Sequence, residues 1–95
     1  MPFTYILRCA DDSYYVGSTR GELMARVRQH DVGTGSQYTA SRRPVALVWA
    51  AKFDRVTEAF AMEKKLQGWS RSKREALIEG RFGDLPRLSA SGPRD

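Results

Sequence analysis

Residues 3–18 read FTYILRCADDSYYVGS, and this stretch decides how the fold begins. Over residues 3–8, aromatic and apolar side chains recur with the two-residue period of a strand that has two distinct faces. Residues 11–13 (DDS) favour a turn, and residues 14–16 (YYV) favour a second strand because aromatic and β-branched side chains suit a pleated surface. The stretch therefore predicts an antiparallel hairpin, which Gly17 either ends or opens to a close backbone approach.

The rest of the chain predicts three helices and one more strand. Residues 22–31 have helical apolar spacing, and residues 33–44 (GTGSQYTASRRP) predict a loop. Residues 45–53 form a nearly continuous apolar run, which predicts a third strand that is buried on both faces and interior to the sheet. Further helices are expected from about residue 56 to 68 and, after a serine cap, from about 70 to 80.

The element order β-β-α-β-α-α predicts an α+β fold, a three-stranded antiparallel sheet flanked by helices. A chain of 95 residues holds one compact domain, expected over residues 2–82, and the aperiodic residues 83–95 are expected to form a flexible tail. The chain shows neither the roughly 20 apolar residues of a membrane-spanning helix nor a secretory signal, which predicts a cytoplasmic protein with no membrane partner. One cysteine excludes an internal disulfide, and no cysteine or histidine cluster offers a structural zinc site.

The charge balance points to an anionic partner. Sixteen Lys and Arg against eleven Asp and Glu give a net charge of +5, a pattern expected of proteins that bind a phosphate backbone. Charge alone fits an ordinary basic domain equally well. Its distribution favours nucleic acid, because basic residues gather in the last two predicted helices and in the loop before the third strand: Lys64, Lys65, Arg71, Lys73 and Arg74, with Arg42 and Arg43.

One carboxylate lies inside the apolar side of a predicted helix. At about 100° per residue, Glu63 projects between Val56 and Ala59, with Phe60 close by. An unpaired charge buried there would cost several kcal/mol, so Glu63 is expected to be protonated, paired with a cation such as Arg26, or bound to a metal. The residues alone leave open a structural ion pair, a metal ligand and a wrong helix phase.

A possible catalytic pair lies on the first predicted helix. Arg26 and His30 are four residues apart and therefore neighbours on one side of it. The guanidinium could hold a phosphate oxygen, and the imidazole could move or orient a proton near neutral pH. Taken by themselves, the two residues fit an ordinary solvated helix edge better.

The chain has four tyrosines, in the hairpin and in the loop: Tyr5, Tyr14, Tyr15 and Tyr38. Most tyrosines at such positions pack with the ring buried and the hydroxyl wet. A phenol with a pKa of about 10 is a poor base at pH 7 unless a nearby cation lowers that pKa. Arg26, or a metal on Glu63, would supply the cation, so the three signals support one another if the elements converge.

Taken together, these residues resemble the GIY-YIG nucleases. The segments FTYIL at 3–7 and YYVGS at 14–18 resemble the paired strands of that family. Further matches to the family pattern, in chain order, are Leu23, Arg26, His30, and Glu63 within EAFAMEKKLQGWSRSKREAL. The likeness covers residues 3–79 and is closest to the small standalone bacterial subgroup, which shares GTGSQYT, RRPV and the Gly-Trp-Ser junction at 68–70. Phe3 and Thr4 replace the name-giving Gly and Ile, and the chain lacks the asparagine that several members carry on the last helix.

The resemblance implies a metal-dependent endonuclease that hydrolyses phosphodiester bonds in DNA. It implies one Mg²⁺ or Mn²⁺ ion on Glu63 and phosphate binding by Arg26. Tyr5 is expected to be the general base, with Tyr15 and His30 positioning it or relaying its proton, and the order among these three stays open.

The same resemblance implies a nucleic-acid surface with largely sequence-independent affinity. The residues expected to contact the substrate are Tyr38, Arg42, Arg43, Lys64, Lys65 and Lys73. Trp69 is expected in the core. Branched, nicked or single-stranded DNA are the expected substrates, and RNA and the oligomeric state stay open. Two rival hypotheses are a nucleic-acid-binding module that has lost turnover and a protein-interaction domain.

Overall fold

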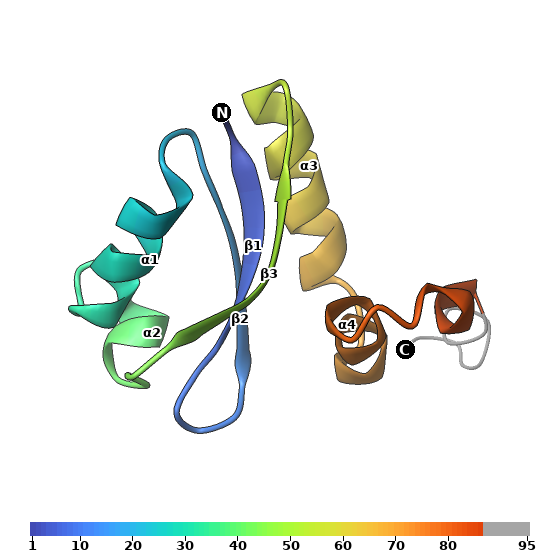
Figure 1. Ribbon diagram of the computed structural model, residues 1–95. Coiled ribbons are helices and arrows are strands. Elements are labelled where there is room, and N and C mark those ends of the chain that lie inside the picture. The colour runs from blue at the N-terminus through green and yellow to red at the C-terminus, as the bar shows by residue number, and fades with distance from the viewer. Residues whose placement is uncertain (87–95) are drawn as a thin grey trace.

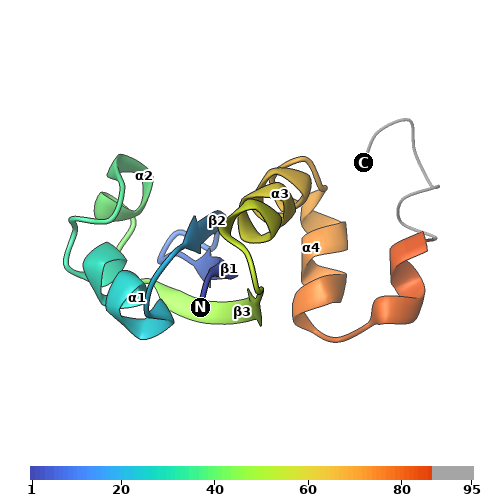
Figure 2. The ribbon, with the colours of Figure 1, turned by 90° about the horizontal axis from the view of Figure 1, so that it is seen from above.

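The computed structural model describes residues 1–86. A three-stranded sheet lies between two helical layers, with α1 and α2 on one side and α3 and α4 on the other (Figure 1; Figure 2). In chain order the elements are β1 (Phe3–Arg8), β2 (Tyr14–Thr19), α1 (Leu23–Asp31), α2 (Gln37–Ala40), β3 (Ala46–Lys52), α3 (Val56–Gln67), α4 (Arg71–Ile78) and a 3₁₀ turn, Phe82–Asp84.

The sheet has the order β2-β1-β3 with antiparallel pairs, so β1 is the interior strand. The prediction that residues 45–53 form an interior strand buried on both faces is therefore wrong in both respects, because β3 lies at an edge and its residues are half-buried or exposed. Both faces of the sheet are covered by helices, and the apolar run of β3 packs Leu47 toward one layer and Val48 and Trp49 toward the other. A run of apolar residues indicates that side chains on both faces of a strand contact other elements. It does not indicate whether both backbone edges of the strand are hydrogen-bonded.

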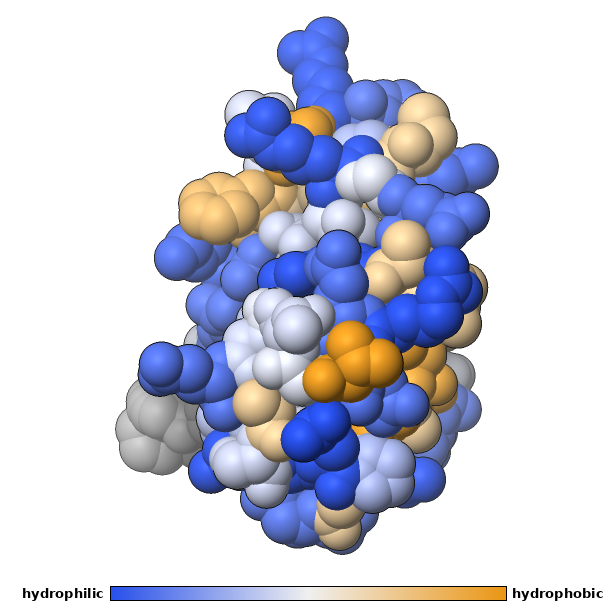
Figure 3. All heavy atoms as spheres, turned by 90° about the vertical axis from the view of Figure 1, so that its left-hand side faces the viewer, coloured by the Kyte–Doolittle hydropathy of each residue, from blue (hydrophilic) through white to orange (hydrophobic). Residues whose placement is uncertain are grey.

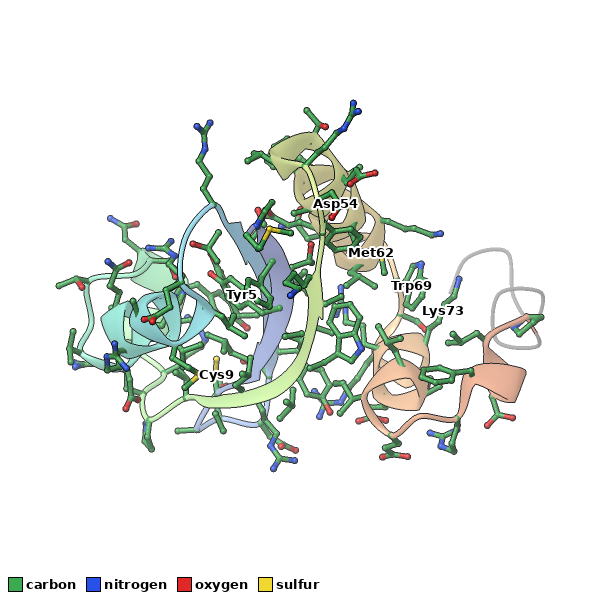
Figure 4. The ribbon with its side chains drawn as sticks, turned by 45° about the horizontal axis from the view of Figure 1, so that its top comes forward. Tyr5, Cys9, Asp54, Met62, Trp69 and Lys73 are labelled. Carbon is green, nitrogen blue, oxygen red and sulfur yellow. The ribbon has the colours of Figure 1, made fainter. Side chains whose placement is uncertain are left out.

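The side chains of β1 alternate between two separate cores. Tyr5 and Leu7 pack with Val27 of α1, whereas Ile6 packs with Leu66 of α3 and with β2 and α4 residues. Figure 4 shows Tyr5 on the α1 side of the sheet and Met62 and Trp69 on the opposite side. The predicted core position of Trp69 is confirmed, because this side chain packs against the α3 and α4 cluster.

The predicted loop at 33–44 contains a short helix that the sequence did not predict. Helix α2 has four residues, and the Oγ atom of Ser36 caps it by accepting a hydrogen bond from the Thr39 N–H at 3.1 Å. Four residues are too few to show a helical apolar period, so α2 depends on its cap and on tertiary contacts.

The two C-terminal helices begin and end close to the predicted residues. Ser70 caps α4 by accepting a hydrogen bond from the Lys73 N–H at 3.1 Å. Of the predicted tail, residues 87–95 lie outside the described part of the chain. Among residues 1–86, no helix combines the length and apolarity that crossing a bilayer requires.

Candidate active site

Four of the predicted catalytic residues converge between the sheet and α1. The Tyr5 hydroxyl lies 2.9 Å from His30 Nε2, and Arg26 Nε donates a hydrogen bond to the same hydroxyl at 3.3 Å. The ring of Tyr15 lies against the imidazole with a centroid distance of 4.9 Å. Arg26 and His30 therefore form part of a tyrosine site, and the interpretation as a plain solvated helix edge is wrong.

Gly17 makes this arrangement possible. It lies within β2, which continues to Thr19, and pairs directly with Tyr5 on β1. A Cβ atom at Gly17 would lie 2.6 Å from the Tyr5 hydroxyl oxygen, far inside van der Waals contact. Of the two predicted roles, Gly17 therefore permits a close approach and does not end the strand; the approaching group is the phenol ring.

Burial and the Arg26 charge set the protonation of this group. Burial, and then the nearby Arg26 charge, lower the pKa of His30 from 6.5 to about 4, so the imidazole is neutral at pH 7. Burial raises the pKa of Tyr5, although the Arg26 hydrogen bond and charge oppose that rise. Arg26 is thus the expected cation and acts to lower the pKa of the phenol, but burial outweighs it.

The other ring nitrogen of the imidazole faces α2. His30 Nδ1 lies 2.8 Å from the Thr39 hydroxyl oxygen, and the side chains of His30 and Thr39 are both 0% exposed. The Thr39 hydroxyl in turn lies 3.0 Å from the Oγ atom of Ser36. The imidazole is therefore held at both nitrogens, by β1 on one side and by α2 on the other.

Glu63 lies on the other side of the sheet, on α3. The Ser18 hydroxyl donates to its Oε1 atom at 2.5 Å, and Gln67, one helical turn further, donates to its Oε2 atom at 2.9 Å. Glu63 is half-buried beside the buried Ala59 and Leu66, so its predicted direction is right.

The predicted surroundings of Glu63 need two corrections. The apolar stripe is narrower than expected, because Val56 and Phe60 are 39% and 52% exposed. The ion pair with Arg26 is wrong for the described residues: the Arg26 guanidinium donates instead to Tyr5, to Gln29 at 2.8 Å and to the Gly35 carbonyl at 3.1 Å. Neutral donors therefore orient the carboxylate without neutralising it.

The two halves of the site meet at the free edge of β2. Tyr15 and Gly17 face the α1 layer, whereas Val16 and Ser18 face α3. The negative charge of Glu63 contributes to the raised pKa of Tyr5, so the two halves interact electrostatically through this strand.

The donor set suits a cation that keeps most of its own water. Within residues 1–86, no three His, Cys, Asp or Glu side chains come together to form a metal cage. Glu63 instead offers one anionic carboxylate, oriented by two neutral hydrogen-bond donors. Mg²⁺ commonly binds through one or two carboxylates together with water and substrate phosphates, so the residues fit this ion.

Two of the predicted nucleic-acid-binding residues adjoin the site. The Tyr38 ring lies 6.0 Å from that of Tyr15, and the Arg42 guanidinium stacks 3.8 Å above Tyr38. The same guanidinium pairs with Asp11 at 3.0 Å. The α1 and α2 face is mostly hydrophilic with scattered apolar side chains (Figure 3), as expected of a surface that meets water or a polar partner.

The other predicted basic residues do not form one surface. Lys64 lies 5.0 Å above the Phe60 ring, and Phe60 lines a hollow beside the β2 edge. Lys65 is exposed and follows Glu63 by two residues, about 200° further around α3. Lys73 covers Trp69 at 4.2 Å (Figure 4). Arg43 donates to the Ala40 carbonyl at 2.9 Å on the outside of the loop.

The sequence interpretation missed several residues around the site. One of them is Gln67, which lines a hollow of about 220 Å³ beside β2. The other lining residues are Tyr14, Tyr15, Val16, Tyr38 and Arg74. Helical spacing places Gln67 one turn after Glu63 and could have identified it. Ser18 and Thr39 belong to other elements than the side chains they contact, so no local pattern indicates them.

Comparison with known proteins places the chain in a family. The GIY-YIG catalytic domain matches residues 1–76. A UPF0213 protein of Natronomonas pharaonis is 38% identical over 81 residues, 85% of this chain and 94% of that protein. The UPF0213 protein YazA of Bacillus subtilis is 34% identical over 93 residues, 98% and 93% of the two chains.

A solved structure shares the whole fold. The solution NMR structure of a UPF0213 protein from Bacillus halodurans is 31% identical and covers 100% of both chains, with a TM-score of 0.55. The predicted α+β fold is thereby confirmed. Since the domain match and these relatives span most of the chain, this protein belongs to the GIY-YIG family of nucleases.

Proposed function

We propose that this protein is a divalent-metal-dependent endonuclease that hydrolyses phosphodiester bonds in DNA. The family supports a nucleic-acid substrate. The observation that carries the proposal is that Tyr5, His30 and Arg26 lie on one face of the sheet and Glu63 on the other, on either side of the edge strand β2. A proton acceptor, a fixed cation and a carboxylate are the groups that a metal-assisted hydrolysis requires.

Tyr5 and His30 act together as the base. Because the neutral imidazole accepts the phenol proton at Nε2, Tyr5 can take a proton from the attacking water while it passes its own to His30. No isolated phenolate then forms in a buried site, which is consistent with the raised pKa of Tyr5. Tyr15, half-buried beside the imidazole, is the most exposed of these three residues, because Tyr5 and His30 are both 0% exposed.

Arg26 binds the phosphate. A guanidinium has five N–H groups, and the three hydrogen bonds to Tyr5, Gln29 and Gly35 leave two for oxygen atoms of the substrate. These contacts hold the planar group in place before the substrate arrives. A fixed cation of this kind stabilises the negative charge that builds up on the non-bridging oxygens.

Glu63 would hold one Mg²⁺ or Mn²⁺ ion. When bound, this ion supplies Lewis-acid stabilisation of the leaving 3′ oxygen. Ser18 and Gln67 hold the carboxylate oxygens in place for it. A substrate along the β2 edge would also pass Tyr38, Arg42 and Lys64, and a domain this small is expected to select branched, nicked or single-stranded structure more than long sequence.

Cleavage assays with two matched variants test the proposal. Purified wild type should nick plasmid or structured DNA oligonucleotides with Mg²⁺ or Mn²⁺ and not with EDTA. Glu63→Gln should lose at least about a hundredfold in rate while it still binds DNA, as expected when a metal ligand is neutralised. Glu58→Gln is the control, because Glu58 lies on the same helix, is exposed and caps the helix with an oxygen that the amide retains.

The assay also separates the rival functions. Full cutting by Glu63→Gln would refute the metal assignment. If wild type binds every DNA structure but cuts none, the result would favour a binding module. The chain supports this alternative because it lacks the asparagine that several family members carry on the last helix. RNA oligonucleotides in the same assay test the alternative substrate.

A further inference from the structure

A short element outside the proposed catalytic residues encloses the imidazole. The segment formed by Gly35, Ser36 and Thr39 runs over the His30 ring, and a Cβ atom at Gly35 would lie 2.5 Å from His30 Nδ1. The Gly35 carbonyl also accepts a hydrogen bond from Arg26. This loop therefore holds both functional side chains of α1.

The hydrogen-bond chain has a preferred direction. Arg26 can only donate, so the Tyr5 oxygen accepts from it, and the phenol proton still needs an acceptor. His30 Nε2 at 2.9 Å is that acceptor, and leaving a buried hydroxyl proton unpaired would cost about 1–3 kcal/mol. A neutral imidazole whose Nε2 accepts must carry its proton on Nδ1.

Thr39 completes the chain at Nδ1. Its hydroxyl oxygen, 2.8 Å from Nδ1, accepts a hydrogen bond from the Nδ1–H group. The Thr39 hydroxyl donates its own hydrogen bond to Ser36, whose Oγ lies 3.0 Å away and whose carbonyl oxygen lies 3.4 Å away. Ser36 is held by capping α2. The protons of Tyr5, His30 Nδ1 and Thr39 then each have an acceptor, whereas the opposite tautomer would make Nε2 a donor and leave the Tyr5 hydroxyl proton without this acceptor.

We propose that Thr39, held by Ser36, is a positioning residue that keeps His30 in the Nδ1-protonated tautomer. Free histidine prefers the proton on Nε2, so the folded protein must supply the difference. The consequence rests on the proposed function: only with a bare Nε2 can His30 receive the Tyr5 proton during hydrolysis. Neither Thr39 nor Ser36 touches the substrate in this scheme.

The chain offers a direct measurement, because His30 is its one histidine. In a long-range ¹H–¹⁵N correlation spectrum of protein labelled in the imidazole, the two nitrogen signals need no assignment to a residue. At pH 7 wild type should show Nδ1 as the protonated nitrogen. Wild type with the proton on Nε2 would refute the proposal, whether or not the protein cuts DNA.

Three threonine variants test the role of the hydroxyl. Thr39→Val keeps the shape and removes the hydroxyl, so the Nδ1 form should lose its preference and kcat should fall on the order of a hundredfold, within the range of a general-base contribution. Thr39→Ser should restore both. Thr34→Val is the control, because this loop threonine is exposed and bonds only the Gln29 carbonyl at 3.2 Å.

The outcomes separate this inference from the proposed function. An unchanged tautomer in folded Thr39→Val, or equal losses in Thr39→Val and Thr39→Ser, would refute the positioning role. If Thr39→Val does not fold, the wild-type and Thr39→Ser spectra still decide the tautomer. A further outcome is that wild type is inactive while the Nδ1-protonated tautomer is present in wild type and in Thr39→Ser and lost in Thr39→Val. In that case the proposed endonuclease activity is wrong, and the positioning of His30 by the Thr39 hydroxyl is supported.

Discussion

Mild acid is expected to destabilise this protein through the buried imidazole of His30. Its pKa is lowered from 6.5 to about 4, by burial first and by the Arg26 charge second. Between pH 6.5 and about 4, His30 is therefore protonated in the unfolded chain but neutral in the folded protein. The free energy of unfolding falls as the pH drops through this range. The stability is fully present above pH 6.5, where neither state is protonated.

The expected loss is a large part of the total. At roughly 1.4 kcal/mol per pH unit, the interval from 6.5 to about 4 corresponds to roughly 3.5 kcal/mol, of which about 2.5 kcal/mol should be lost between pH 7 and 4.5. Small domains have about 5–15 kcal/mol of stability in all. Few other groups interfere, because the unperturbed pKa values of carboxylic acids lie near or below the end of this interval.

Urea unfolding at fixed ionic strength measures this loss. Trp49 and Trp69 provide the fluorescence signal, and the free energy of unfolding is obtained at pH 7, 6, 5 and 4.5. The His30→Gln variant is less stable throughout, but its stability should change little over the same interval. Wild-type stability that varies by less than about 0.5 kcal/mol, or a slope that persists in His30→Gln, would refute the reasoning.

Three further variants probe the site. Gly17→Ala should lower the free energy of unfolding by about 1–3 kcal/mol and abolish most cleavage, because the new methyl group overlaps the buried Tyr5 phenol. Gly21→Ala is the control: a Cβ atom there would meet no neighbouring atom within 4 Å, so thermal stability and cleavage rate should be nearly unchanged. Arg42→Ala should weaken DNA binding and reduce the slope of log affinity against log salt by about one, whereas equal effects from Lys65→Ala would show that only total charge matters. Gln67→Leu should weaken Mn²⁺ binding about tenfold in a titration of cleavage rate; an unchanged midpoint would remove it from the metal site.

Local patterns predicted much of this fold and some of the site. The hairpin, α1 and α3 follow from periods of two and of 3.6 residues, which are properties of short segments. The same helical period singles out Glu63 without reference to any family. The predicted interior position of β3 is wrong because an apolar run indicates which strand faces are in contact with other elements. Whether an edge of the strand is hydrogen-bonded depends on the backbone pairing.

The partners of the site residues depend on contacts between distant segments. Ser18 meets Glu63 across 45 positions of the chain, and a serine after a glycine indicates nothing by itself. Thr39 meets His30 only because the unpredicted helix α2 folds over the ring. The direction of the Tyr5 pKa shift was also beyond the sequence, since burial outweighs a correctly expected arginine.

The division of the site between two faces of one edge strand has a consequence for how activity can be lost. Successive residues of β2 serve opposite layers, so a slip of one position in the pairing with β1 would turn Tyr15 toward α3 and Ser18 toward α1. Each half-site would then lose one supporting side chain, Tyr15 beside His30 and Ser18 beside Glu63. The register of one hairpin therefore sets a supporting contact on each face of the site.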